Sequence, residues 1–208
     1  MPDATVSQTR ASLHAVAEML LAGPQFRRSG TIRLRALTGG FGTVTDPDVR
    51  VVGSSLLFGG EKASLSSTTI GTLAAALGLE AGAPANYRDG TGADVGTEID
   101  VDAGAAAHLA DCYAWGDAAL RRLEPSATPV LWPEHFDIAI TADEVNFGVS
   151  PGDSFLDEPY AYVGPWTPHT GDFWNAPFGS ARPLSGMESG PESILAFFAE
   201  GRDRATLD

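Results

Sequence analysis

The chain has 208 residues, of which 43% are apolar and 19% are charged. This apolar fraction, with ten Phe, four Trp and four Tyr, supplies a folded core and excludes a disordered chain. The formal net charge of −14 disfavours binding to DNA, RNA or an anionic membrane surface, because those partners attract proteins through Lys and Arg.

In the first half of the chain, apolar spacing predicts helices and strands that are separated by glycine-rich turns. Leu13, Val16 or Ala17, and Leu20 recur at helical spacing, and Gly23 and Pro24 form a predicted stop. The glycine clusters match neither the dinucleotide fingerprint nor a phosphate-binding loop, so they are predicted turns. The predicted elements are a helix over 8–22, strands over 31–37 and 49–58, a helix from Ser67 to about Gly78, and a loop over 80–96.

In the second half, a long helix precedes a group of strands. Asp102 is suited to cap the helix, because its carboxylate can accept from the first free N–H groups. The predicted elements are a helix over 102–123, strands over 130–141, 145–150 and 160–166, and a final helix over 191–200, with Pro191 in its first turn and Gly201 as its stop.

Together these elements predict an α+β fold, an antiparallel sheet with several packed helices. We expect a single compact domain over 1–208, with a helix/strand-hairpin/helix part over 1–123 and an acidic aromatic sheet part over 124–208. The single Cys112 cannot form an internal disulfide, and no apolar run reaches the roughly 18 residues that span a bilayer. The N-terminal residues lack the pattern of a secretory signal, so the sequence predicts a cytoplasmic protein.

The segment 123–181 differs from the rest of the chain in charge. It contains no Lys or Arg, but it carries nine carboxylates and ten of the aromatic residues. Carboxylates without cationic neighbours repel one another, so we expect some of them to be solvated, protonated, or paired with a metal ion or a cationic ligand.

Strand alternation divides this segment into two faces. If residues 141–145 turn, Ile138 lies opposite Val149 and Ile140 lies opposite Phe147 on a core face that also holds Phe136, with Ala161 and Val163 of the next strand also facing inward. The other face is a predicted pocket floor around the small Ala139 and Gly148, with the loop 150–159 as a lid. Its predicted ligand-binding residues are His135, Asp137, Asn146, Ser150, Tyr160, Tyr162 and Trp166. The simpler alternative is the solvated face of an antiparallel sheet.

A divalent metal site is a second hypothesis for the same face. His135 and Asp137 are an i, i+2 pair that suits two ligands of zinc, manganese or iron. The candidates for a third ligand are His169, Asp153, Glu158 and Asp172. The alternative is a histidine that is hydrogen-bonded to a neighbouring carboxylate.

Two weaker motifs have structural explanations. Residues 100–104 resemble the start of a calcium loop, but Ala105 replaces the glycine that such a loop needs, and Asp102 is better explained as a helix cap. Cys112 shares a helix with His108, but its apolar neighbours predict a buried thiol rather than a nucleophile.

Three motifs, LWPEHFD at 131–137, NFGVSPGD at 146–153 and EPYAYVGPW at 158–166, occur together. This succession resembles an uncharacterised actinobacterial family, a domain of unknown function. The resemblance implies that the motifs belong together and brings no catalytic assignment.

The leading functional hypothesis is a protein that binds a small polar or cationic molecule in an acidic aromatic recess. The alternatives are a metal-dependent hydrolase or isomerase that uses His135 and Asp137, and a non-catalytic module whose aromatic face packs on a second copy in a homo-oligomer.

Overall fold

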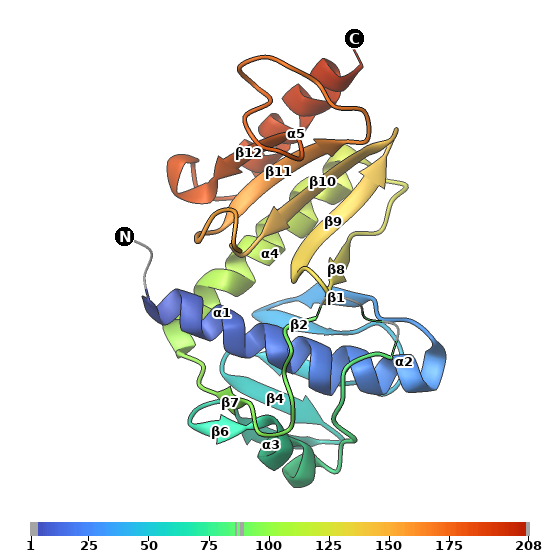
Figure 1. Ribbon diagram of the computed structural model, residues 1–208, viewed down its shortest axis with the longest axis vertical. Helices are drawn as coiled ribbons and strands as arrows, with labels where there is room; N and C mark the ends of the chain where they lie inside the picture. The colour runs from blue at the N-terminus through green and yellow to red at the C-terminus, as the bar shows by residue number, and fades with distance from the viewer. Residues whose placement is uncertain (1–3, 86, 88–89, 207–208) are drawn as a thin grey trace. The chain divides into compact units, whose positions relative to one another are not determined.

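The computed structural model describes residues 4–85, 87 and 90–206 (Figure 1). The chain has the α+β fold that the sequence predicts, with antiparallel strands and packed helices. Its residues form two compact units: unit 1 comprises Met1–Asp111 and Leu131–Phe136, and unit 2 comprises Cys112–Val130 and Asp137–Asp208. Among the described residues, no helix combines the length and the apolar character that a membrane crossing requires.

The first helix of unit 1 continues past its predicted end. α1 (Ala4–Val16) is followed without a break by the π-helix η1 (Ala17–Ala22) and by α2 (Gly23–Ser29), which ends at Gly30. In the π-helical turn, the backbone N–H of Gly23 donates to the carbonyl of Glu18, five residues earlier. The missing N–H of Pro24 therefore falls where the regular ladder is already altered, and the chain stays helical. The predicted stop at Gly23 and Pro24 is wrong.

The sheet of unit 1 contains more strands than predicted. In spatial order, its antiparallel strands are β8 (Val130–Trp132), β1 (Leu34–Leu37), β2 (Gly40–Thr43), β3 (Arg50–Val52), β4 (Ser55–Phe58) and β5 (Glu61–Ser64). The predicted strand 49–58 is a hairpin that turns at Gly53. The glycine cluster predicted as a turn supplies β2, where Gly40 leaves space for the carbonyl of Val51 on β3.

Polar caps define the helices that follow. α3 (Ile70–Leu77) is capped by Thr69 rather than by Ser67, because the Thr69 hydroxyl accepts from the Thr72 N–H, and it ends at Gly78 as predicted. β6 (Thr68–Thr69) pairs with β7 (Glu98–Ile99). α4 (Ala103–Leu123) begins after Asp102, whose carboxylate accepts from the N–H of Ala105 at 2.8 Å, as predicted. Residues 86, 88 and 89 of the predicted loop 80–96 lie outside the described residues.

The sheet of unit 2 has the predicted register. Its antiparallel strands are, in spatial order, β9 (Asp137–Ala142), β10 (Val145–Ser150), β11 (Tyr160–Pro165) and β12 (Ser180–Pro183). Ile138 pairs with Val149 and Ile140 pairs with Phe147, and all four side chains are buried. The predicted strand 130–141, however, is interrupted by a turn at 133–136, in which Phe136 has φ 55. Phe136 therefore leaves the predicted core face and instead packs against Phe41 in unit 1.

Two glycines let helices approach this sheet closely. A side chain at Gly116 of α4 would place its Cβ 2.9 Å from Ile138 and 3.0 Å from Val149. Gly201 is the predicted stop of the last helix, yet α5 (Pro191–Ala205) continues past it. A Cβ at Gly201 would lie 2.6 Å from the side chain of Val163 on β11, so this glycine serves packing.

Candidate functional site

Tyr162 crosses the polar face of the unit 2 sheet towards Asp137. In the register, Gly148 on β10 lies opposite Tyr162 on β11. A Cβ at Gly148 would be 2.5 Å from the phenol oxygen of Tyr162, so the ring lies over this glycine. The Tyr162 hydroxyl donates to Oδ2 of Asp137 on β9. The absent side chain at Gly148 is thus what lets the two polar groups meet.

In the Asp137–Tyr162 pair, Asp137 is buried, with only 6% of its surface exposed, and Tyr162 is partly buried. Burial, reinforced by the neighbouring Asp137 carboxylate, raises the pKa of Tyr162 well above its usual value. The phenol therefore remains protonated and stays a hydrogen-bond donor at physiological pH.

A second tyrosine–aspartate pair lies beside the first. The Tyr160 hydroxyl donates to Oδ2 of Asp153 at 2.6 Å, while Oδ1 of Asp153 accepts from the N–H groups of Phe155 at 2.8 Å and Leu156 at 3.2 Å. Burial and the bond to Asp153 raise the pKa of Tyr160, and the Ser150 hydroxyl also hydrogen-bonds to this phenol. The hydrogen bonds hold the Asp153 carboxylate in place. Unlike Asp137, Asp153 is exposed, so its carboxylate is accessible from solvent.

Two phenyl rings lie over the tyrosines. Phe155, from the loop that the sequence predicts as a lid, lies 5.9 Å from Tyr160 and 5.0 Å from Phe178 between ring centroids. Phe178 in turn lies 6.5 Å from Tyr160 and 6.1 Å from Tyr162. Phe155 is 45% exposed and Phe178 is 38% exposed. We call Asp153, Phe155, Tyr160 and Phe178 the aromatic–carboxylate cluster.

The structure brings together Asp137, Ser150, Tyr160 and Tyr162 of the predicted site and places the others elsewhere. Asn146 lies at the far end of β10, opposite Gly164, and its side chain accepts from Thr141 at 2.7 Å. Trp166 follows β11 at the same end and is 63% exposed. His135 lies on the turn 133–136 of unit 1 and is exposed, so it does not continue the strand face of Asp137 as predicted.

Two of the candidates for a third metal ligand, Asp153 and His169, are engaged in other contacts. Asp153 accepts the hydrogen bonds described above, and the His169 ring stacks on Trp174 at 4.9 Å. Over residues 4–85, 87 and 90–206, no group of three or more His, Cys, Asp or Glu side chains is arranged to hold a metal ion. The metal site of His135 and Asp137 stays a prediction. Cys112 is a buried thiol that forms no disulfide, as the sequence predicts.

A buried carboxylate in unit 1 was not predicted. Glu18, in the π-helix η1, accepts from the backbone N–H of Thr91 at 3.1 Å and from the Thr91 hydroxyl. Its Oε1 lies 3.8 Å from Nε2 of His14, and that nitrogen is also 2.8 Å from the carbonyl of Pro133. Burial raises the pKa of Glu18 and lowers the pKa of His14, so the charge on both side chains is disfavoured.

Two features of the aromatic–carboxylate cluster were not predicted from the sequence: the ring of Phe178 and the role of Asp153 as the acceptor for Tyr160. The spacing between Asp153 and Tyr160 carried a signal, because a short loop returning to the same sheet end brings its first residues beside the next strand. Phe178 had no signal in the local sequence.

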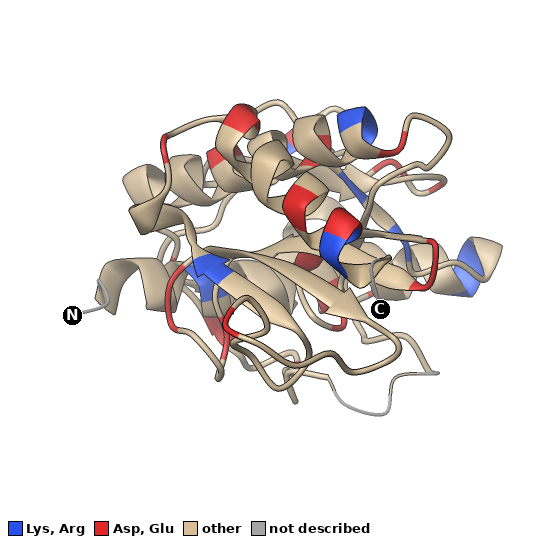
Figure 2. Cartoon of the chain, turned by 90° about the horizontal axis from the view of Figure 1, so that it is seen from above, with Lys and Arg blue, Asp and Glu red and all other residues tan. Residues whose placement is uncertain are grey.

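Asp and Glu are spread over helices and loops (Figure 2), in keeping with the net charge of −14. The chain matches no family model, no curated protein and no solved structure.

Proposed function

We propose that the protein binds a small cationic molecule at the aromatic–carboxylate cluster of unit 2. The observation that carries the proposal is the position of the Asp153 carboxylate, which is exposed and held by three hydrogen bonds. One of these comes from Tyr160, whose ring packs against the half-exposed ring of Phe155. A cation gains from a fixed carboxylate and from the face of an aromatic ring at the same time.

The charge of the surrounding segment supports a positive ligand over a negative one. Residues 123–181 contain no Lys or Arg, so no cation of the segment competes for Asp153. The side chains beneath the cluster are also organised, since the Asp137–Tyr162 bond and the Asp153–Tyr160 bond hold both phenols in place. Such preorganisation lowers the entropic cost of binding.

The motifs that resemble the actinobacterial family support the same site. They span 131–137, 146–153 and 158–166, and they contain Asp137, Ser150, Asp153, Tyr160 and Tyr162. A cytoplasmic location is part of this proposal, because the buried Cys112 forms no disulfide and needs no oxidising compartment.

The test uses choline as the cationic probe and 3,3-dimethylbutan-1-ol, in which carbon replaces the charged nitrogen, as its neutral counterpart. We expect saturable calorimetric or NMR binding of choline and much weaker binding of the alcohol. Asp153→Asn should weaken choline binding roughly five- to tenfold, because it removes the charge and keeps a carbonyl acceptor.

The matched control is Asp143→Asn, an exposed carboxylate on the β9–β10 turn whose φ of 51 asparagine tolerates well. This variant should bind choline as the unaltered chain does. Equal binding of choline and the alcohol, or an equal loss in both variants, would refute the site. If choline does not bind and the chain self-associates through Trp166, the interaction-module alternative takes its place.

A further inference from the structure

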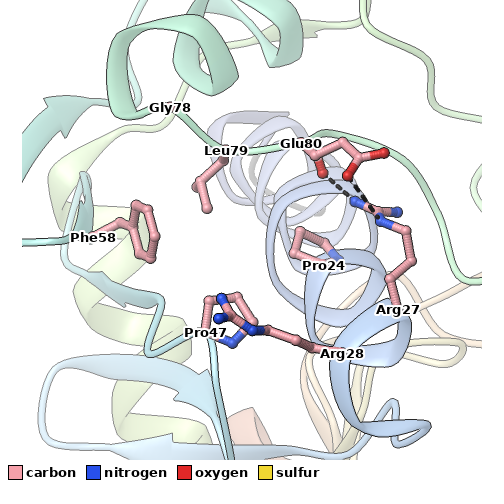
Figure 3. A pocket seen from close by; sticks show the side chains of 8 residues that line it. All are labelled: Pro24, Arg27, Arg28, Pro47, Phe58, Gly78, Leu79 and Glu80. Carbon is pink, nitrogen blue, oxygen red and sulfur yellow. Dashed lines mark hydrogen bonds and ion pairs between the residues drawn. The ribbon is translucent and has the colours of Figure 1, made fainter.

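Unit 1 contains a pocket that none of the predicted site residues line. It has a volume of about 260 Å³ and lies between α2, β4 and the chain segment that follows α3 (Figure 3). Figure 3 shows Phe58, Leu79, Pro24 and Pro47 around one space, with the Arg28 side chain extended beside Pro47. Small-molecule sites range from about 300 to 1,000 Å³, so the pocket suits a ligand of one ring or a short chain.

One wall of the pocket is held in place by Arg27. Its guanidinium donates to the carbonyls of Glu80 and Gly82, the latter at 3.3 Å, and lies 3.7 Å from the Glu80 carboxylate. The N–H of Gly82 donates to the carbonyl of Met19 at 2.9 Å, and the absent side chain of Gly23 leaves space for the Gly82 carbonyl. Arg27 is thus a structural clamp whose charge is matched by Glu80.

Arg28 differs from Arg27, because its positive charge is not paired with any carboxylate of the described residues. Within the described parts of the chain, the Arg28 side chain has neither a hydrogen bond nor an ion pair. It lies on α2 one residue after the clamp and reaches the apolar pocket wall.

The local sequence reinforces this positive character. Residues 19–45 carry four arginines and no carboxylate, which is the reverse of the segment 123–181. The net charge of the whole chain acts weakly here, because salt screens exposed charges beyond about 8 Å at physiological ionic strength. The pocket has both an apolar wall and the Arg28 guanidinium at its edge. This combination favours a ligand with an apolar body and an oxyanion, since guanidinium pairs well with carboxylate and phosphate.

We propose that this pocket is a binding site for a small organic anion. The apolar part of the ligand lies among Pro24, Pro47, Phe58 and Leu79, and its oxyanion pairs with Arg28. This site lies in a different unit from the aromatic–carboxylate cluster and takes a ligand of opposite charge. A negative result for either proposal therefore leaves the other proposal unaffected.

The experiment compares two probes of nearly equal shape, the anion 4-fluorophenylacetate and the neutral 4-fluorophenylacetamide, by ¹⁹F NMR titration of the full chain. We expect saturable binding of the anion and weaker binding of the amide. Arg28→Gln should weaken anion binding roughly three- to tenfold and leave amide binding unchanged, because it removes the charge alone. Leu79→Trp fills the pocket and should abolish binding of both probes.

Arg35→Gln is the matched control, because Arg35 is exposed on β1 and does not line the pocket. It should bind the anion as the unaltered chain does. The proposal is overturned if the anion shows no saturable binding at millimolar concentration, if the amide binds equally well, or if Arg35→Gln weakens anion binding as much as Arg28→Gln. Arg28 makes no hydrogen bond or ion pair with the described residues, so we expect its variant to fold. The comparison of the two probes therefore remains decisive even if Leu79→Trp does not fold.

Discussion

Gly201→Ala tests the packing of α5 on the unit 2 sheet. The added Cβ would lie 2.6 Å and 2.8 Å from the two methyl carbons of Val163 and 3.1 Å from its Cβ. Carbon atoms in favourable contact are about 3.5–4.0 Å apart, so the helix must move away from β11 by several tenths of an ångström or more.

The size of the effect follows from two opposing contributions. Overpacking of this kind costs about 1–3 kcal/mol, whereas replacing glycine by alanine inside a helix gains about 1 kcal/mol. We therefore expect the free energy of unfolding to fall by about 0–2 kcal/mol. Removing the contacted methyls in the double variant Gly201→Ala, Val163→Ala should relieve the clash, so the double variant should be more stable than the two single effects together imply.

The assay is urea unfolding, followed by far-UV circular dichroism and tryptophan fluorescence. Gly186→Ala is the control, because a Cβ there meets no atom within 4 Å, and its stability should change by less than about 0.5 kcal/mol. If Gly201→Ala is more stable than the unaltered chain, the close contact with Val163 does not restrict this position and Gly201 is not a packing residue.

Two further predictions concern buried polar groups. Burial raises the pKa of Glu18, so its contribution to stability is present below the unfolded pKa and is lost as the pH rises through the folded pKa. Glu18→Gln removes the charge and keeps an acceptor for Thr91. It should raise the free energy of unfolding by about 1 kcal/mol at pH 8 but not at pH 4, as measured by urea unfolding at both pH values. A lower free energy of unfolding at pH 8 would contradict the role of burial. Tyr162→Phe should lower the free energy of unfolding by about 1.5–3 kcal/mol, because it leaves buried Asp137 without its phenol donor. Tyr160→Phe should lower it less, because water can replace the bond from this phenol to exposed Asp153. Equal losses of stability in the two variants would argue against this difference in burial.

The candidate site was partly predictable because strands alternate with a period of two. That period placed Asp137, Ser150, Tyr160 and Tyr162 on one face, and the structure confirms the register that joins them. The alternation carried no information about distance along the face, so Asn146 was grouped with Ser150. The two residues lie four positions apart on β10, roughly 14 Å at about 3.4 Å per residue.

Other parts of the site depended on contacts between residues far apart in the sequence. Phe178 reaches Tyr162 from a segment with no periodic pattern, and His135 was lost to the turn that interrupts the predicted strand. A backbone turn inside an apolar run leaves little trace in residue spacing, so alternation alone extended the strand through it.

The sequence by itself determined the α+β class, the register of β9 and β10, the cap at Asp102, and the uneven distribution of charge. These features follow from local backbone geometry and from residue types, which do not depend on distant neighbours. Only the tertiary structure decided what the glycines do. Gly201 packs against Val163 inside a helix, and Gly23 leaves space for a carbonyl beside Pro24. A glycine is a helix stop or a packing position according to what lies beside it, and that neighbour comes from another part of the chain.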